Sequence, residues 1–543
     1  MKSEHEGSVE SGSGPELLDG LVSLDKDSQL QRGLKSRHIQ FLALGGAIGT
    51  GLFVGSGGIL AIVGPLPLWL GYLSQMFVVW CVMNAIAEMT TYLPMRGITL
   101  PYFTNRYVDG SLAFAAGWNY WYAYAILVAA EASAGAILLD YWNTPVHAAV
   151  WITIILIVCL ALNIIAVEVF GEAEFWFASI KLITILGLII TGIVIMAGGA
   201  PNREAIGFRT WNDPGAIKPY VATGNWGNFL AYWTAFVRAG FSFITSPELI
   251  GLAAGETVAP RRNIPKAARR FLYRLAIFYG VSSLILGCLV RSDHPRLLSP
   301  ESNANASPWV IGIQEAGIGG LNHVINAAIL TSAWSAGNAF LYSGSRILYS
   351  LAATGQAPRI FTRTTRRGVP YAAVLGTWSL GLLAYLNVSE NGATVFTWFM
   401  NISTISGFIA WIVVLITYLR FRSALKFQGL LDTLPFKTIG QPYLSWFVLV
   451  LVSLLTLTNG FQVFAIKAAD GGFDYKNFLA AYITIPAFLI LYVGHKLVYR
   501  TPLCKPLADV DVVTGKKEMD EWCEGDVKPV PKNWLQRVWF WIA

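Results

Sequence analysis

The chain has 543 residues, of which 55% are hydrophobic and only 13% are charged, and its mean hydropathy is +0.52. Its uncharged stretches are long enough to cross a hydrocarbon core of roughly 30 Å, which excludes a soluble globular protein and predicts an all-α polytopic membrane protein. The net charge of +7 comes from basic loops and forms no nucleic-acid-binding patch. The sequence has no GxxxxGK[ST] motif, no zinc-type Cys/His spacing and no catalytic-triad pattern, so we predict no enzyme, no cofactor and no metal site.

Residues 1–37 are polar and lack the basic-then-apolar pattern of a signal peptide, so we expect a disordered cytoplasmic tail. A membrane domain follows at 38–498, and residues 499–543 form a second cytoplasmic tail. We predict twelve transmembrane helices, at approximately 39–63, 66–91, 112–139, 146–167, 173–198, 226–254, 271–291, 321–350, 371–387, 394–419, 443–465 and 477–498.

The basic residues of the loops predict the orientation of the chain, because Lys and Arg are enriched in cytoplasmic loops. They gather after the sixth span and at the start of the seventh, and after the eighth and tenth spans, so all three groups follow even-numbered spans. Both termini are therefore expected to face the cytoplasm, and the lipid bilayer is one expected partner. The basic residues are Arg261, Arg262, Lys266, Arg269, Arg270 and Arg274; Arg359, Arg363, Arg366 and Arg367; and Arg420, Arg422, Lys426 and Lys437.

The first span is unusually rich in glycine. Seven glycines fall within the fourteen residues from Gly45 to Gly58, GGAIGTGLFVGSGG. Backbone that leaves the helical conformation at membrane depth is tolerated only where protein buries it or where it lines a polar cavity. The pattern therefore predicts a broken first helix, whose freed N–H groups could hold a carboxylate.

The sixth span carries a second candidate break, in GFSFITSPELIG at 240–251. Pro247 removes a backbone donor, and nearby hydroxyls can bond the carbonyls that this releases. Glu248 is expected to accept from donors that the break exposes. The alternative is ordinary helix packing, because glycine and proline are both common in membrane helices.

The positions of the two breaks favour the first interpretation, because inverted-repeat transporters interrupt corresponding helices. Spans one and six are five apart. This spacing predicts a five-helix repeat at about 39–198, a second at about 226–419, and two further helices at about 443–498.

The two breaks predict complementary chemistry. The N–H groups of Ala47, Ile48, Gly49, Thr50 and Gly51 lie at the positive end of a half-helix and would hold a carboxylate. The carbonyls of the second break, at the negative end of another half-helix, would hold an ammonium group. A ligand that carries both charges close together is an α-amino acid. The residues expected at this second pole are Phe241, Ser242, Phe243 and Thr245.

Five ordered blocks of the chain resemble the fungal amino-acid permeases of the amino acid–polyamine–organocation superfamily, the yeast amino acid transporter family. The resemblance implies a twelve-helix, LeuT-like fold at the plasma membrane that imports amino acids together with protons. The blocks are RGLKSRHIQFLALGGAIGTGLFVGSG at 32–57, GWNYWYAYAILVAAEASA at 117–134, GEAEFWFASIKLITILG at 171–187, AAGETVAPRRNIPKAARR at 253–270 and SAWSAGNAFLYSGSRILYSLA at 332–352.

The resemblance also places the substrate carboxylate on the backbone from Ile48 to Gly51 and the amino group against the unwound part of span six. Family members often read FSFxGxEL in that part, whereas this chain reads FSFITSPEL, which is one residue longer. The register of the pocket among Phe241, Ser242, Phe243 and Thr245 is therefore open. This variant is similar to the proline-type branch, which makes proline a candidate substrate.

Lys181 in span five is an ionisable residue at membrane depth, where a charge costs roughly 3 kcal/mol and suggests a functional role. Desolvation favours the neutral amine, so Lys181 could exchange a proton in each cycle. In the resembling family, sodium-coupled relatives place an ion near the corresponding region. A lysine there looks like a replacement for that ion that handles protons instead. The alternative is a permanently charged tether that bonds the unwound backbone of span one.

Glu131 in span three lies among small residues that permit close helix approach. It could take the coupling proton, line the substrate path or bond a neighbouring helix. Tyr124 on the same span is a candidate pocket residue. On span eight, Trp334, Ser335 and Asn338 recur at helical spacing, which fits either a lining face or a packed one.

The leading hypothesis is a secondary active importer of a neutral amino acid such as proline, driven by protons. One alternative is an amino-acid sensor that does not transport, although such sensors tend to carry a cytoplasmic extension longer than the 37-residue tail seen here. Another is a carrier of GABA, choline or polyamines, for which further acidic residues would be expected in the pocket. Ubiquitin ligases or trafficking adaptors are possible partners at the tails.

Overall fold

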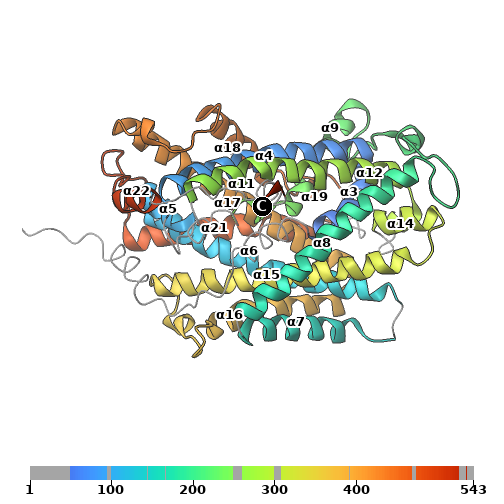
Figure 1. Cartoon of the computed structure of the whole chain (residues 1–543), viewed down its shortest axis with the longest axis horizontal. Coiled ribbons are helices and arrows are strands. Elements are labelled where there is room, and N and C mark those ends of the chain that lie inside the picture. The colour runs from blue at the N-terminus through green and yellow to red at the C-terminus, as the bar shows by residue number, and fades with distance from the viewer. Residues whose placement is uncertain are drawn as a thin grey trace, which may run out of the picture.

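The computed structural model describes residues 49–94, 100–142, 145–165, 167–248, 260–298, 307–390, 392–466, 472–524 and 533–534. Throughout these ranges the regular secondary structure is helical, with no strand. Most of the long helices run roughly parallel to the longest axis of the molecule (Figure 1).

Eight helices in the described ranges are long and apolar enough to cross a membrane. A ninth span results if α20 (Tyr475–Tyr482) and α21 (Thr484–Tyr499), which meet at an angle of 45°, are taken together. These helices confirm a polytopic membrane protein, whereas the count of twelve spans and the inverted repeat remain predictions. The eight are α4 (Pro65–Tyr92), α6 (Gly110–Asp140), α7 (Ala148–Ile165), the part of α8 (Val167–Met196) from Trp176 to Met196, the continuous α11 (Pro260–Leu275), η4 (Ala276–Val281) and α12 (Ser282–Leu289), α15 (Leu321–Ala353), α16 (Tyr371–Gly381) with η7 (Leu382–Val388), and α17 (Gly392–Phe427).

Shorter helices complete the described chain and connect these spans. They are η1 (Gly51–Gly55), α3 (Ser56–Val63), α5 (Leu100–Tyr107), η2 (Trp211–Gly215), α9 (Gly224–Ala239), η3 (Gly240–Ser242), α13 (Pro295–Leu298), α14 (Pro308–Glu315), η6 (Arg359–Thr362), η8 (Leu431–Thr433), α18 (Tyr443–Leu457), α19 (Gln462–Ala465) and α22 (Lys516–Glu524).

The centre of the molecule is formed by α6, which packs against both α15 and α17. In Figure 1, α4 and α11 run along one side of this centre, and α7 and α16 run along the opposite side. Small residues allow the central helices to approach closely: a Cβ on Gly337 of α15 would lie 3.3 Å from the Cβ of Glu131 on α6. Asn119, Glu131 and Ser133 of α6 are buried between these helices.

The outer helices expose apolar side chains where lipid would surround them. On α7 and α8 the exposed residues include Ile157, Trp176, Ile183 and Ile190. An apolar outer surface of this kind is expected for helices whose solvent is the hydrocarbon core of a bilayer.

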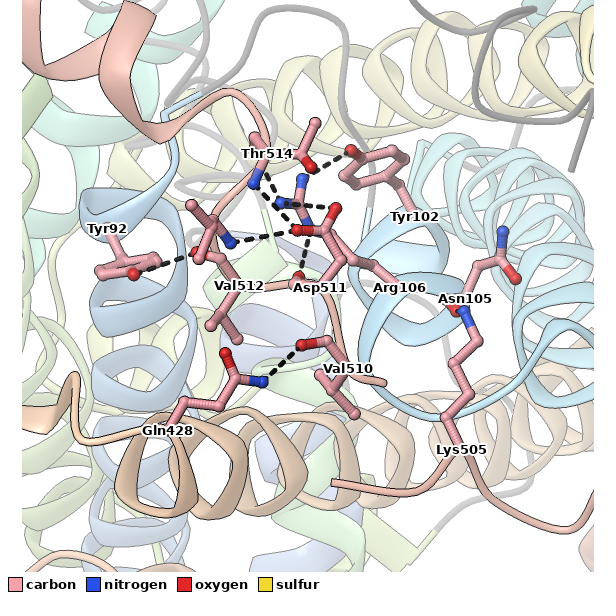
Figure 2. A network of polar contacts seen from close by, with 11 residues as sticks. Tyr92, Tyr102, Asn105, Arg106, Gln428, Lys505, Val510, Asp511, Val512 and Thr514 are labelled. Carbon is pink, nitrogen blue, oxygen red and sulfur yellow. Dashed lines mark hydrogen bonds and ion pairs between the residues drawn. The ribbon is translucent and has the colours of Figure 1, made fainter. Parts of the chain in front are cut away.

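A segment near the C-terminus, residues 501–514, which we call the strap, crosses the ends of several helices (Figure 2). The Tyr92 hydroxyl at the end of α4 donates to the Val512 carbonyl over 3.0 Å, and the Gln428 amide donates to the Val510 carbonyl over 2.8 Å. Both valine side chains are buried. The strap is therefore a packed part of the helical domain.

Arg106 of α5 is the main polar anchor of the strap (Figure 2). Its guanidinium donates to the carbonyls of Asp511 and Thr514, each over 2.7 Å, and lies 3.1 Å from the Asp511 carboxylate. Burial by itself raises the pKa of the Asp511 carboxyl, but bonds from the Thr514 backbone and the charge of Arg106 outweigh it, so the pKa is lower than usual.

Candidate functional site

The sixth span is broken within the described residues. Helix α9 ends at Ala239 and tightens into η3, and turns follow until helical conformation resumes at 246–248. Thr245 has a φ of +69°, a left-handed conformation that costs a β-branched residue roughly 1–2 kcal/mol. An interruption in span six, as the sequence predicts, is therefore present.

The role that the sequence suggests for Pro247 is wrong. We expected this proline to interrupt a helix, yet it is the second residue of the helical conformation that begins at residue 246 and is described as far as residue 248. Proline is favoured in a first turn, because its missing N–H would have no intrahelical acceptor there. The irregular backbone precedes it, at Phe243 to Thr245.

The first span is described only from Gly49 onward, so Ala47 and Ile48 lie outside the described residues. Gly49 is in a bend, and helical conformation begins at Thr50 and continues as the π-helix η1. A helix start leaves its first N–H groups without intrahelical acceptors and carries a partial positive charge. Short π-helical segments often mark functional sites.

The two irregular segments contact each other through η1 and η3. A Cβ on Gly51 would lie 2.6 Å from Ser242 Oγ and 3.0 Å from Ser242 Cα, so only glycine fits between the two backbones. The structure thus brings together Gly51 and Ser242, two residues that the sequence assigns to opposite poles of one site.

Two tyrosines that the sequence analysis did not single out hold this contact. The Tyr72 hydroxyl lies 3.3 Å from the Gly51 carbonyl and 3.2 Å from Ser242 Oγ, so it bridges both irregular segments. The Tyr279 hydroxyl donates to the Ser242 carbonyl over 2.8 Å. Phe243 packs on Tyr279 with ring centroids 4.3 Å apart. No motif distinguishes Tyr72 or Tyr279 from other core aromatics, so only the fold identifies them.

Phe241 and Phe243, the predicted aromatic residues of span six, lie in different parts of the core. Phe243 is fully buried against Tyr72 and Tyr279, in the part of the core that includes α4. Phe241 instead packs edge-on against Phe396 of α17, with ring centroids 6.0 Å apart, in the part of the core formed with α6. Of the two residues, Phe241 is the one that shares a core cluster with Tyr124.

A group of buried polar side chains lies on the α6 side of the break. The hydroxyls of Tyr124 and Thr245 are close enough to interact, but neither has a well-formed hydrogen-bond partner among the described residues. The same holds for the hydroxyls of Tyr120 and Ser246 and for one carboxylate oxygen of Glu248, which lies near both tyrosines. Buried polar groups are nearly always satisfied, so such a cluster indicates a place for a ligand or water.

Thr50 connects the start of η1 to the predicted coupling residues. Its hydroxyl donates to Glu131 Oε1 over 3.0 Å, and Glu131 in turn interacts electrostatically with Lys181. The side chains of all three are buried. The structure therefore brings Thr50, Glu131 and Lys181 into one polar cluster between the first span, α6 and α8.

Glu174 of α8 belongs to the same cluster and was missed from the sequence. It is buried, it interacts electrostatically with Lys181, and both of its carboxylate oxygens lie 2.9 Å from the Ser335 hydroxyl of α15. The available signal was its spacing, since Glu174 precedes Lys181 by seven residues and so shares its helix face. Among the described residues, no group of three or more His, Cys, Asp or Glu could hold a metal ion.

Comparisons with known proteins agree with this architecture. The sequence model of the family described as "Amino acid permease" matches residues 38–507. The chain is 54% identical to a proline-specific permease of Emericella nidulans, over 100% of this chain and 99% of that protein. It is 52% identical to a probable proline-specific permease of Schizosaccharomyces pombe, over 92% and 90% of the two chains. It is 47% identical to a proline-specific permease of Saccharomyces cerevisiae, over 93% and 82%.

Proposed function

Since the chain belongs to the amino acid permease family, as a fungal permease of the proline type and not an enzyme, we propose that it imports proline, or a closely similar neutral amino acid, across the plasma membrane by proton symport. Both termini face the cytoplasm in this proposal, as the basic loops suggest. The substrate assignment is supported by the three proline-specific relatives. The binding mode is supported by the contact between η1 and η3.

The proposed site holds the two charges of the amino acid on backbone groups. The carboxylate accepts hydrogen bonds from the N–H groups that open the first described helix, at Thr50 and Gly51. The ammonium donates to carbonyls of the irregular segment from Phe241 to Thr245. Neither pole requires a charged side chain, so binding needs no permanent ion pair and remains reversible.

The side chain of the substrate would lie on the α6 side of the break. Phe241 and Tyr124 supply apolar surface there, and the hydroxyls of Tyr124 and Thr245 supply polar contacts. A compact pyrrolidine ring suits such a mixed surface. Ala47 and Ile48 complete the carboxylate pole in this proposal, although they lie outside the described residues.

Thr50 explains how substrate and proton would be coupled. Its backbone belongs to the carboxylate pole, while its hydroxyl bonds Glu131, which faces Lys181. Substrate binding that shifts the start of η1 would therefore alter the surroundings of Glu131 and Lys181. This connection favours proton exchange at Lys181 over the alternative, in which a permanently charged Lys181 only bonds the backbone of span one. That structural role would not need Glu131 to be bonded to Thr50, a residue of the proposed substrate site.

The test is uptake of radiolabelled proline by cells that lack their own proline permeases and express this chain. The proposal predicts saturable uptake that is stronger at pH 5 than at pH 7, collapses with a protonophore, and is inhibited by excess unlabelled proline more than by lysine, glutamate, GABA or choline. Binding without uptake would indicate a sensor, and stronger inhibition by a cation would indicate a carrier of cationic amines. Uptake that ignores both pH and protonophore would contradict proton symport.

A further inference from the structure

Glu174 has surroundings that packing alone does not explain. Its carboxyl group is buried between helices near the start of α8. An ionised carboxylate is costly to bury unless it is paired or fully hydrogen-bonded. The Ser335 hydroxyl, 2.9 Å from each oxygen, has one proton to donate and cannot satisfy a carboxylate that accepts several hydrogen bonds. Intramembrane acids of this kind mark ion or proton pathways.

The position of Glu174 relative to Lys181 supports such a role. The two residues lie two helical turns apart on one face of α8, about 10 Å along the helix axis. Lys181 interacts electrostatically with Glu174 on its own helix and with Glu131 on α6. One amine thus interacts with two buried carboxylates. When all three groups are ionised their net charge is −1, which a bilayer interior disfavours, so the cluster can reversibly hold an additional proton.

Further polar groups continue from Glu174 towards one end of the bundle. Asn338 lies three residues after Ser335 on α15, and its side-chain oxygen accepts from Asn163 over 2.8 Å. Asn163 is two residues from the end of α7 at Ile165. Asn163 Oδ1 and Asn338 Nδ2 have no hydrogen-bond partner in the described part of the chain, and unsatisfied buried groups of this kind are where ordered water binds.

This end of the bundle is the cytoplasmic one in the proposed orientation. Helix α7 corresponds to the predicted fourth span, and even-numbered spans end at the cytoplasmic side. Glu174 lies about 10 Å into α8, counted at 1.5 Å per residue from Val167, and Lys181 lies deeper. Besides Lys181, the Cys159 thiol of α7 interacts electrostatically with Glu174. A thiol is ordinarily neutral at physiological pH, so among the described side chains that interact with Glu174, Lys181 is the proton donor.

We infer that Glu174 is the group through which the coupling proton leaves Lys181 for the cytoplasm, an inference that rests on the proposed proton symport. The Lys181 ammonium transfers one proton to the Glu174 carboxylate, which leaves a neutral amine and a carboxylic acid. The acid then releases that proton to water near Asn338 and Asn163 and becomes a carboxylate again. The amine receives the next proton from the outer side, through Glu131.

The test compares Glu174→Gln with Glu172→Gln, which removes a partly exposed acid two residues away on the same helix. Two transport modes are measured: accumulation of proline against its gradient, and exchange of external labelled proline for internal proline. A one-proton symporter gains about tenfold accumulation for each pH unit of gradient. We expect Glu174→Gln to lose this gain and its sensitivity to protonophore while keeping exchange, because exchange requires no net proton release. Glu172→Gln should retain both modes.

A second variant keeps the test decisive if Glu174→Gln does not reach the membrane. Glu174→Asp retains a carboxylate and should restore proton-driven accumulation, whereas a packing role would be met better by Gln, which matches Glu in size. The inference is overturned if a membrane-localised Glu174→Gln accumulates proline as the wild type does, or if Glu174→Asp accumulates none while exchanging normally. If the wild type itself shows no proton dependence, the proposed symport fails and this inference fails with it. If the wild type and Glu174→Gln both show proton-driven accumulation of proline, this inference is refuted while the proposed symport stands.

Discussion

Gly51→Ala perturbs the contact between the two irregular segments by a single methyl group. That methyl would lie 2.6 Å from Ser242 Oγ and 3.0 Å from Ser242 Cα, whereas ordinary contacts begin at 3.4 Å. The hydroxyl can rotate away, but the Cα belongs to the backbone, so η3 must retreat by about 0.4 Å. Hydrogen bonds with Tyr72 and Tyr279 hold Ser242 in place and oppose this movement.

Overpacking of this kind costs typically about 1–3 kcal/mol, which corresponds to roughly 5- to 150-fold in an equilibrium constant. Because the strain falls between the two poles of the proposed site, we expect proline affinity to fall by this factor. Gly58→Ala is the matched control, since a methyl there would meet nothing within 4 Å. The assay is the concentration dependence of proline uptake, normalised to the amount of protein at the cell surface.

Unchanged proline affinity in a surface-localised Gly51→Ala protein would refute the reasoning, because it would mean that the contact between η1 and η3 does not shape the site. Equal losses in Gly51→Ala and Gly58→Ala would also refute it, because they would point to a general requirement for glycine in this helix.

Three further predictions follow from the structure. Lys181→Met should reach the surface but lose the pH dependence of uptake; a pH profile of initial rates measures this, and an unchanged profile would assign Lys181 to a structural role. Tyr72→Phe should raise the KM for proline about 2- to 10-fold, because it removes hydrogen bonds worth roughly 0.5–1.5 kcal/mol to the two irregular segments; a KM equal to that of the wild type would contradict this bridging role. Asp511 has a lowered pKa in the folded state, so its stabilisation of the strap is fully present above its ordinary pKa of about 4 and is lost as the pH falls through the lower folded value. The protection of the strap amides against hydrogen exchange, relative to an unfolded chain at the same pH, should therefore fall below about pH 4 in purified protein. Asp511→Asn should show low protection at neutral pH, and high protection in that variant would contradict the role of the ion pair with Arg106.

The sequence predicts the class of the fold and the general location of the second break, because both depend on local composition. Hydrophobic stretches of membrane-spanning length identify the helices, and GFSFITSPELIG marks the interruption in span six. The prediction that Pro247 causes this interruption was wrong, because the backbone leaves the helical conformation before Pro247, at Phe243 to Thr245. A local sequence reveals a disturbed helix more reliably than it reveals where one half ends and the next begins.

The residues that connect separate helices could not be predicted from local patterns. Tyr72 and Tyr279 resemble ordinary core aromatics until the fold places them on Ser242. Glu174 gains its significance from Ser335, 161 residues away, and Arg106 from a strap about 400 residues away. The periodicity of one helix defines its faces, but it does not say which other helix each face contacts.

The most direct test of the account is an experimentally determined structure of this protein with proline bound. The account predicts the proline carboxylate within about 3 Å of the N–H groups at Thr50 and Gly51, and the ammonium at a similar distance from carbonyls between Phe241 and Thr245. Proline bound elsewhere, or held at both ends by charged side chains while the Thr50 and Gly51 N–H groups have other partners, would contradict it.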